Sequence, residues 1–186
     1  MKTQCAFRQS WFSVFLFSAA LVGVAAARPA MALDIGGLAQ KAAGAGASKG
    51  RDEVVKKVNA KLLAEGRKNQ CSFKKDSDQF DGDCDKKLKS LANTLVDMKK
   101  QLQVGGVTTF KFEVSGHTDS SGKAEHNKEL SGKRAAVIAK ELMARGIPQN
   151  EIISVGMGSD KPVVTPDNTE AKKKKNRRYE IQVKFS

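Results

Sequence analysis

The chain has 186 residues, a length that predicts one domain of ordinary size and argues against a multidomain enzyme. Lys and Arg number 33 against 20 Asp and Glu, and the resulting charge of +13 excludes an acidic disordered protein and is compatible with a polyanionic partner. Two His and three Cys provide few ligands for a zinc or iron–sulfur site, so we expect no metal and no cofactor.

The first 32 residues have the features of a secretory signal peptide. Lys2 and Arg8 form a basic start, residues 11–27 are uncharged and mostly apolar, and a small-x-small cleavage site ends at Ala32. An uncleaved inner-membrane anchor is the alternative, but a stretch of this length is at the short limit for a spanning helix. We therefore expect cleavage near Ala32, export from the cytoplasm and no transmembrane span in the mature chain.

The cysteines predict one disulfide. Cleavage would remove Cys5 and leave Cys71 and Cys84 as an even pair in a compartment where disulfides persist. A bridge between them would stabilise the fold by about 3 kcal/mol in the chain-entropy model. Two separately packed thiols are the alternative.

Residues 33–66 are expected to form a flexible leader that contains a short amphipathic helix. The segment 33–50 is rich in Gly, Ala and Ser and offers few apolar anchors. Between 51 and 65, apolar side chains recur on one helical face: Val54, Val55, Val58 and Leu62. This face could pack on the following domain or bind an envelope protein partner, and the sequence does not distinguish the two.

The remaining residues, 67–186, are expected to form one α/β domain. Their hydropathy pattern predicts a strand at 70–74, a helix at 88–102, a strand at 109–115, a helix at 122–145 and strands at 152–155 and 179–185. The Asp-rich run at 76–85 lacks the Glu and the flanking helices of a calcium-binding EF-hand, so a solvated helix N-terminus is favoured. The order β-α-β-α-β-loop-β predicts a sandwich with helices packed on a mixed β-sheet.

Arg134 lies on the side of its predicted helix that the apolar residues mark as buried. At about 100° per residue, it falls within the arc defined by Leu130, Ile138 and Leu142. Its stem could pack there while the guanidinium reaches water. Alternatively, the buried charge needs a carboxylate partner from the protein or from a ligand.

Asn127 and Asp119 bring complementary polar groups to the same place. Asn127 shares the helical face of Arg134, and Asp119 lies in the loop that enters the helix, at a strand–helix junction where ligands commonly bind. The set suits a zwitterion, with Asp119 facing an ammonium group and Arg134 a carboxylate. A nucleophile with an adjacent base is missing, so we expect a binding protein and no enzyme. A hydrolase built on His117, Asp119 and His126 is a weaker alternative.

Five sequence motifs resemble those of a known family. They are GHTDSSG at 116–122, Asn127, LSGKRA at 130–135, GMGSDKPV at 156–163 and NRRYEI at 176–181. In order and spacing they resemble the OmpA-like peptidoglycan-binding domain, over roughly residues 70–186. The resemblance implies non-covalent binding of peptidoglycan in the bacterial periplasm, next to the cell wall and the outer membrane, and a contribution to cell-envelope integrity.

The resemblance also implies roles for single residues. In that family, the Asp of GHTD and the Arg of the RA pair hold the ammonium and the carboxylate of the diaminopimelate side chain in the stem peptide. These are Asp119 and Arg134 here, and Asn127 would shape the pocket. Supporting roles near the same cleft are implied for the NRR segment: Asn176, Arg177 and Arg178.

One basic segment departs from the family pattern. Where the family often has Gly-Arg-Ala, this chain has Lys172, Lys173 and Lys174, which makes the rim of the cleft basic. The alternative function is therefore a module that binds anionic surfaces or nucleic acid through the Lys172–Arg178 cluster. Export from the cytoplasm and the presence of only one Trp and one Tyr argue against a nucleic-acid partner.

Overall fold

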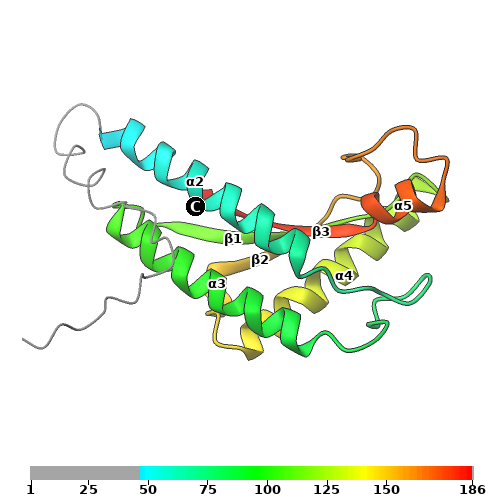
Figure 1. The fold of residues 1–186 in the computed structure, drawn as a ribbon, viewed down its shortest axis with the longest axis horizontal. Helices are drawn as coiled ribbons and strands as arrows, with labels where there is room; N and C mark the ends of the chain where they lie inside the picture. Colours follow the sequence, from blue (N-terminus) through cyan, green and yellow to red (C-terminus); the bar gives the residue numbers. More distant parts are fainter. Residues whose placement is uncertain (1–46, 186) are drawn as a thin grey trace, which may run out of the picture. The chain divides into compact units, whose positions relative to one another are not determined.

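A computed structural model describes residues 47–185 of the protein (Figure 1). The expected signal peptide, 1–32, and the first part of the expected leader, 33–46, lie outside the described residues. The elements are α2 (Ala47–Lys68), α3 (Asp85–Val104), β1 (Phe110–His117), α4 (Ala124–Ala144), a 3-10 turn (Gln149–Glu151), β2 (Ile152–Gly156), α5 (Glu170–Asn176) and β3 (Arg178–Phe185). Within this part of the chain, no helix is both long and apolar enough to cross a membrane.

The three strands form a mixed sheet in the order β2-β1-β3. β1 is parallel to β2, with Val114 opposite Ser154, and antiparallel to β3, with Val114 opposite Ile181. Parallel strands need a crossover connection, and α4 provides it between β1 and β2. The predicted α/β class, with helices packed on a mixed sheet, is confirmed.

One face of the sheet is apolar and carries the helices. Phe112, Val114 and Ile181 belong to this face and are buried in one hydrophobic core with residues of α2, α3 and α4. Gln182 and Glu113 alternate with them and share a hydrogen bond of 2.7 Å on the other face. α2 contacts β3, α4 contacts β1 and β2, and α2 and α3 run side by side (Figure 1).

The structure corrects the prediction of a strand at 70–74. An isolated bridge between Phe73 and Phe80 is the only strand-like pairing described in that segment. The outer edge of β3 bonds to a side chain instead, because the Gln70 amide exchanges two hydrogen bonds with the backbone of Tyr179. This amide satisfies backbone groups that a neighbouring strand would otherwise pair.

α2 is part of the packed domain. Val54 and Val58 are each 1% exposed and join the core of the sheet. Asn59 Oδ1 accepts a hydrogen bond of 2.6 Å from the backbone N–H of Val183 at the edge of β3. The apolar face of this helix therefore packs on the domain, and the described packed unit begins with α2 rather than near the expected boundary at residue 67.

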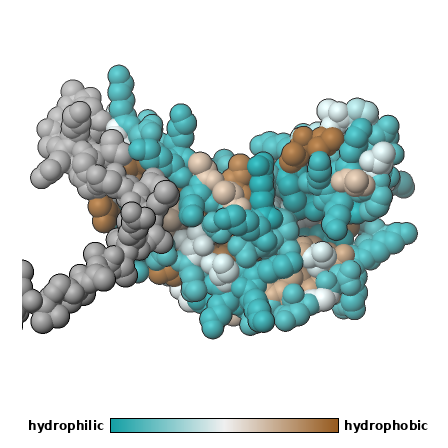
Figure 2. Space-filling model, viewed as in Figure 1, coloured by the Kyte–Doolittle hydropathy of each residue, from teal (hydrophilic) through white to brown (hydrophobic). Residues whose placement is uncertain are grey.

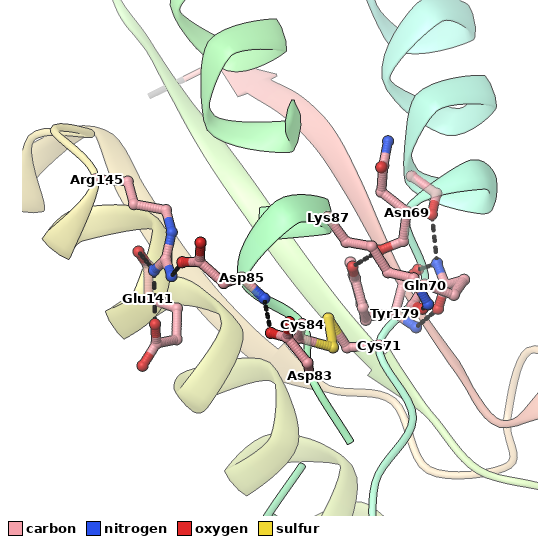
Figure 3. Close-up of a disulfide and its surroundings, with 11 residues drawn as sticks. Asn69, Gln70, Cys71, Asp83, Cys84, Asp85, Lys87, Glu141, Arg145 and Tyr179 are labelled. Atoms are coloured by element: carbon pink, nitrogen blue, oxygen red, sulfur yellow. Dashed lines mark hydrogen bonds and ion pairs between the residues drawn. A yellow bond between two sulfur atoms is a disulfide. The ribbon is translucent and has the colours of Figure 1, made fainter. Parts of the chain in front are cut away.

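A disulfide joins the segment after α2 to the start of α3 (Figure 3). Cys71 and Cys84 are bonded, as predicted, and both are buried. Next to them, the Tyr179 hydroxyl donates to the backbone oxygen of Asn69, which ties this segment to β3. We call residues 72–83, which the bond closes into a loop, the disulfide loop.

Candidate functional site

α4 begins directly beside the end of β1 because Gly116 has no side chain. A Cβ at this position would lie 2.1 Å from the backbone oxygen of Ser131 on α4. The close approach places the first turns of α4 against the loop that leaves β1. Asn127 Nδ2 then donates to the backbone oxygen of Ser121 at 2.9 Å. This corner of strand, loop and helix positions Asp119.

Asp119 lies in the corner and is 9% exposed. Its Oδ1 accepts from the backbone N–H of Ser121 at 2.9 Å, and its Oδ2 accepts from Arg177 Nη1 at 2.7 Å. Burial alone would raise the pKa of this carboxyl, but the hydrogen bonds from Arg177 and Ser121 outweigh it and lower the pKa. Asp119 is therefore ionised at neutral pH, and its two oxygens can accept more hydrogen bonds than the two described.

Arg134 reaches from α4 to the disulfide loop. Its Nε donates to the backbone oxygen of Ser77 at 2.8 Å, and its Nη2 donates to that of Lys74 at 3.1 Å. The guanidinium carbon lies 5.1 Å from the centroid of the Phe73 ring. Burial lowers the pKa of the guanidinium, and the charge of Asp76 opposes this effect.

No protein carboxylate pairs with Arg134 among the described residues. The side chain is 8% exposed, so the guanidinium does not simply extend into water, and backbone carbonyl oxygens hold two of its nitrogens. Within the described chain, Nη1 donates to no group. A buried arginine is expected to pair with a carboxylate, and no described residue supplies one, so this partner is left to a ligand.

Asp119 and Arg134 line the same cavity, which has a volume of about 980 Å³. Its walls come from the end of α2, the disulfide loop, the end of β1, α4, α5 and the start of β3. Three other predicted site residues also line it: Asn127, Arg177 and Arg178. Folding therefore brings residues from distant segments of the sequence to one place.

Asn176 is the predicted site residue that does not line this cavity. It is 1% exposed, and its Nδ2 donates to the backbone oxygen of Val164 and to Asp167 Oδ2, both at 2.9 Å. Its Oδ1 accepts from the N–H groups of Val163 and Val164. Both ends of the Asn176 amide thus bond to the loop at 163–167, so this side chain positions the loop.

Asp167 is a residue that the sequence did not single out. Its carboxylate accepts from the backbone N–H of Ser120 at 3.0 Å, from the Ser120 hydroxyl and from Asn176. The hydrogen bonds from Ser120 and Asn176 lower its pKa to about 2. Asp167 thus ties the loop after β1 to the loop before α5. A lone Asp in a loop carries no periodicity, so only the folded structure identifies it.

The two arginines of the NRR segment differ in their partners. Arg177 bridges Asp119 and Glu170. Arg178 donates from Nε to Glu180 Oε1 at 2.7 Å and lies at the start of β3. Arg177 therefore balances the charge of Asp119 inside the cavity, whereas Arg178 secures the strand.

Two residues of the hydrolase alternative, His117 and Asp119, line the cavity, and the third does not. His117 is 3% exposed, and its Nε2 lies 3.2 Å from Ser115 Oγ. Burial, followed by the charge of Arg178, lowers the pKa of His117 to about 4, so the ring is neutral at neutral pH. His126 is exposed and does not line the cavity.

Comparison with known proteins decides the family. The model of the OmpA family matches residues 72–177, which is more than half of the chain. The chain belongs to the OmpA family. The peptidoglycan-binding protein ArfA of Mycobacterium tuberculosis is 40% identical over 73 residues, or 39% of this chain and 22% of that protein. Outer membrane protein A of Klebsiella aerogenes is 44% identical over 61 residues, or 32% of this chain and 17% of that protein. The chain therefore aligns with only a small part of the length of these relatives.

Solved structures share the fold of this OmpA family member. The peptidoglycan-associated lipoprotein of Burkholderia pseudomallei has a TM-score of 0.51 at 24% identity, covering 63% of this chain and 92% of that chain. The periplasmic domain of Helicobacter pylori MotB has a TM-score of 0.52 at 22% identity, covering 62% of this chain and 71% of that chain. At these identities, the likeness shows the fold alone.

Proposed function

We propose that this protein binds peptidoglycan non-covalently through the diaminopimelate side chain of the stem peptide. Asp119 takes the ammonium group at the end of that side chain, and Arg134 takes the carboxylate. The proposal rests on one observation: a buried, ionised carboxylate and a buried guanidinium with an unused Nη1 line the same cavity. Relatives named as peptidoglycan-binding and peptidoglycan-associated proteins support the same class of ligand.

The proposed role is binding without catalysis. Neither Asp119 nor Arg134 is a nucleophile activated by an adjacent base. Asn127 shapes the corner that holds Asp119, and Arg177 balances its charge. A single zwitterion has few atoms to bury, so each site binds with modest affinity, and attachment to a polymer with many stem peptides strengthens the total.

The proposed location is the periplasm, at the cell wall and next to the outer membrane, after cleavage of residues 1–32 near Ala32. Residues 33–46 then form the start of the mature chain, ahead of α2, and are available to an envelope protein partner. In this role the protein contributes to the integrity of the cell envelope.

Co-sedimentation with washed diaminopimelate-type sacculi tests the proposal. Asp119→Ala and Arg134→Ala should each weaken binding by at least about tenfold, because each removes a charged hydrogen-bonding group worth roughly 1.5–3 kcal/mol. Lys140→Ala is the matched control for the loss of one positive charge, since Lys140 is an exposed residue of α4 outside the cavity. Circular dichroism checks that every variant is folded.

Sacculi that contain lysine in place of diaminopimelate provide the matched ligand. Lysine lacks the carboxylate that pairs with Arg134, so the wild-type protein should bind these sacculi as weakly as Arg134→Ala binds the diaminopimelate type. Binding that persists in both cavity variants and disappears only at high salt would assign attachment to the Lys172–Arg178 cluster and overturn the proposed site.

A further inference from the structure

The cavity that contains Asp119 and Arg134 is lined by many additional cationic side chains. Nine Lys and Arg residues line it, against four Asp and Glu residues. The face of the molecule drawn in Figure 2 is mostly hydrophilic, with a few small hydrophobic patches. The lining of the cavity therefore has a clear excess of cationic over anionic side chains.

Three of the four acidic residues of the cavity already have cationic partners. Arg177 pairs with both Asp119 and Glu170, and Arg178 pairs with Glu180. Asp76 alone of the four forms no ion pair with a described residue. The protein therefore leaves most of the remaining positive charge on the cavity wall unbalanced.

The charged groups of four cavity residues have no hydrogen bond or ion pair with any described residue: Arg67, Lys75, Lys174 and Lys175. Helix lysines elsewhere often have a partner, as Lys57 does with Glu53 and Lys133 does with Glu129. Lys174 and Lys175 lie in the last turn of α5, and Arg67 lies in the last turn of α2. Two elements thus supply unpaired cations to one cavity.

The size of the cavity also exceeds the need of one side chain. A volume of about 980 Å³ is at the upper end of pockets that enclose a whole drug-sized ligand. The end of a diaminopimelate side chain, held between Asp119 and Arg134, fills only a part of it. The cavity therefore has room for a neighbouring part of the stem peptide next to the unpaired cations.

We infer that Lys174 and Lys175 of α5 form a second subsite, which binds anions and takes the α-carboxylate of the neighbouring glutamate in the stem peptide. This glutamate is linked through its γ-carboxyl group, so its α-carboxylate is free and ionised. The inference rests on the proposed function, because the diaminopimelate contact sets where the glutamate lies. In this arrangement, Lys174 and Lys175 determine the specificity for a free carboxylate over a carboxamide.

Isothermal titration with two synthetic peptides tests this subsite. One is the tetrapeptide L-Ala-γ-D-Glu-diaminopimelate-D-Ala, and the other carries a carboxamide in place of the glutamate α-carboxylate. The wild-type protein should bind the acid about fivefold more tightly than the amide, as expected for partly exposed ion pairs. In Lys174→Gln/Lys175→Gln, the two peptides should bind equally. Lys56→Gln/Lys140→Gln is the matched control, because it removes two exposed helix lysines outside the cavity and should keep the fivefold preference.

The outcomes separate this inference from the proposed function. Equal binding of the two peptides by the wild-type protein, at measurable affinity, overturns the subsite and leaves the diaminopimelate contact in place. A preference that persists in Lys174→Gln/Lys175→Gln also overturns it, because other residues then read the carboxylate. Failure of both peptides to bind overturns the proposed function together with the subsite.

Discussion

Loss of the Cys71–Cys84 disulfide should weaken both the fold and the binding site. The cysteines are 13 residues apart, and closing a loop of this size stabilises the folded state by about 3 kcal/mol in the chain-entropy model. The same loop supplies the carbonyl groups of Lys74 and Ser77 that hold Arg134. In an open loop, Arg134 regains rotamer freedom that ligand binding must remove. This ordering costs about 1 kcal/mol, or roughly fivefold in affinity.

Urea unfolding of Cys71→Ser/Cys84→Ser measures the first effect, and titration with a diaminopimelate stem peptide measures the second. Both measurements start from conditions in which circular dichroism shows the variant to be folded. A reducing agent should convert the wild-type protein to the behaviour of the variant and should leave the variant unchanged. A variant that loses about 3 kcal/mol of stability and still binds the peptide like the wild type would refute the claim that the loop preorganises Arg134.

Two further predictions concern packing and pH. Gly116→Ala should lower the free energy of unfolding by at least about 3 kcal/mol, because its Cβ would meet the backbone of α4. Gly66→Ala is the control: its Cβ would have no neighbour within 4 Å, so it should be neutral or slightly stabilising in the same urea experiment. Equal effects of the two substitutions would contradict the close approach. His117 has a folded-state pKa of about 4 against an ordinary value of 6.5, so between these values the unfolded state binds more protons and stability falls as the pH falls. His117 should account for about 3 kcal/mol of the stability lost between pH 7 and pH 4 in urea unfolding. An undiminished loss in His117→Asn would assign it to another group.

Elements that bury one face were predictable from sequence. The spacing of Leu88, Leu95 and Leu102 predicted α3, and all three side chains are buried in the core. The alternation of Phe110, Phe112 and Val114 predicted β1 in the same way, because a half-buried strand repeats every two residues. In these segments, one local pattern determines both the secondary structure and the side that packs.

Pairing partners were not predictable, because a local pattern does not say what lies next to a segment. The segment 70–74 has residues that a strand accepts, yet Gln70 bonds to the edge of β3 through its side chain. Likewise, the apolar face of α2 was recognisable, but its docking depends on β3, which comes more than a hundred residues later. Contacts between distant segments decided both outcomes.

The environment of Arg134 depends on both a local sequence pattern and contacts between distant segments. Helical spacing placed its charge on a buried arc, and the side chain is 8% exposed. Its partners are the carbonyl oxygens of Lys74 and Ser77 in the disulfide loop, and no spacing rule in the sequence predicts these contacts. Carbonyl groups satisfy hydrogen bonds but do not neutralise a charge, and a buried cation without a counter-ion is unfavourable. Under the proposed function, the carboxylate of the ligand supplies the ion pair that no described residue forms with Arg134.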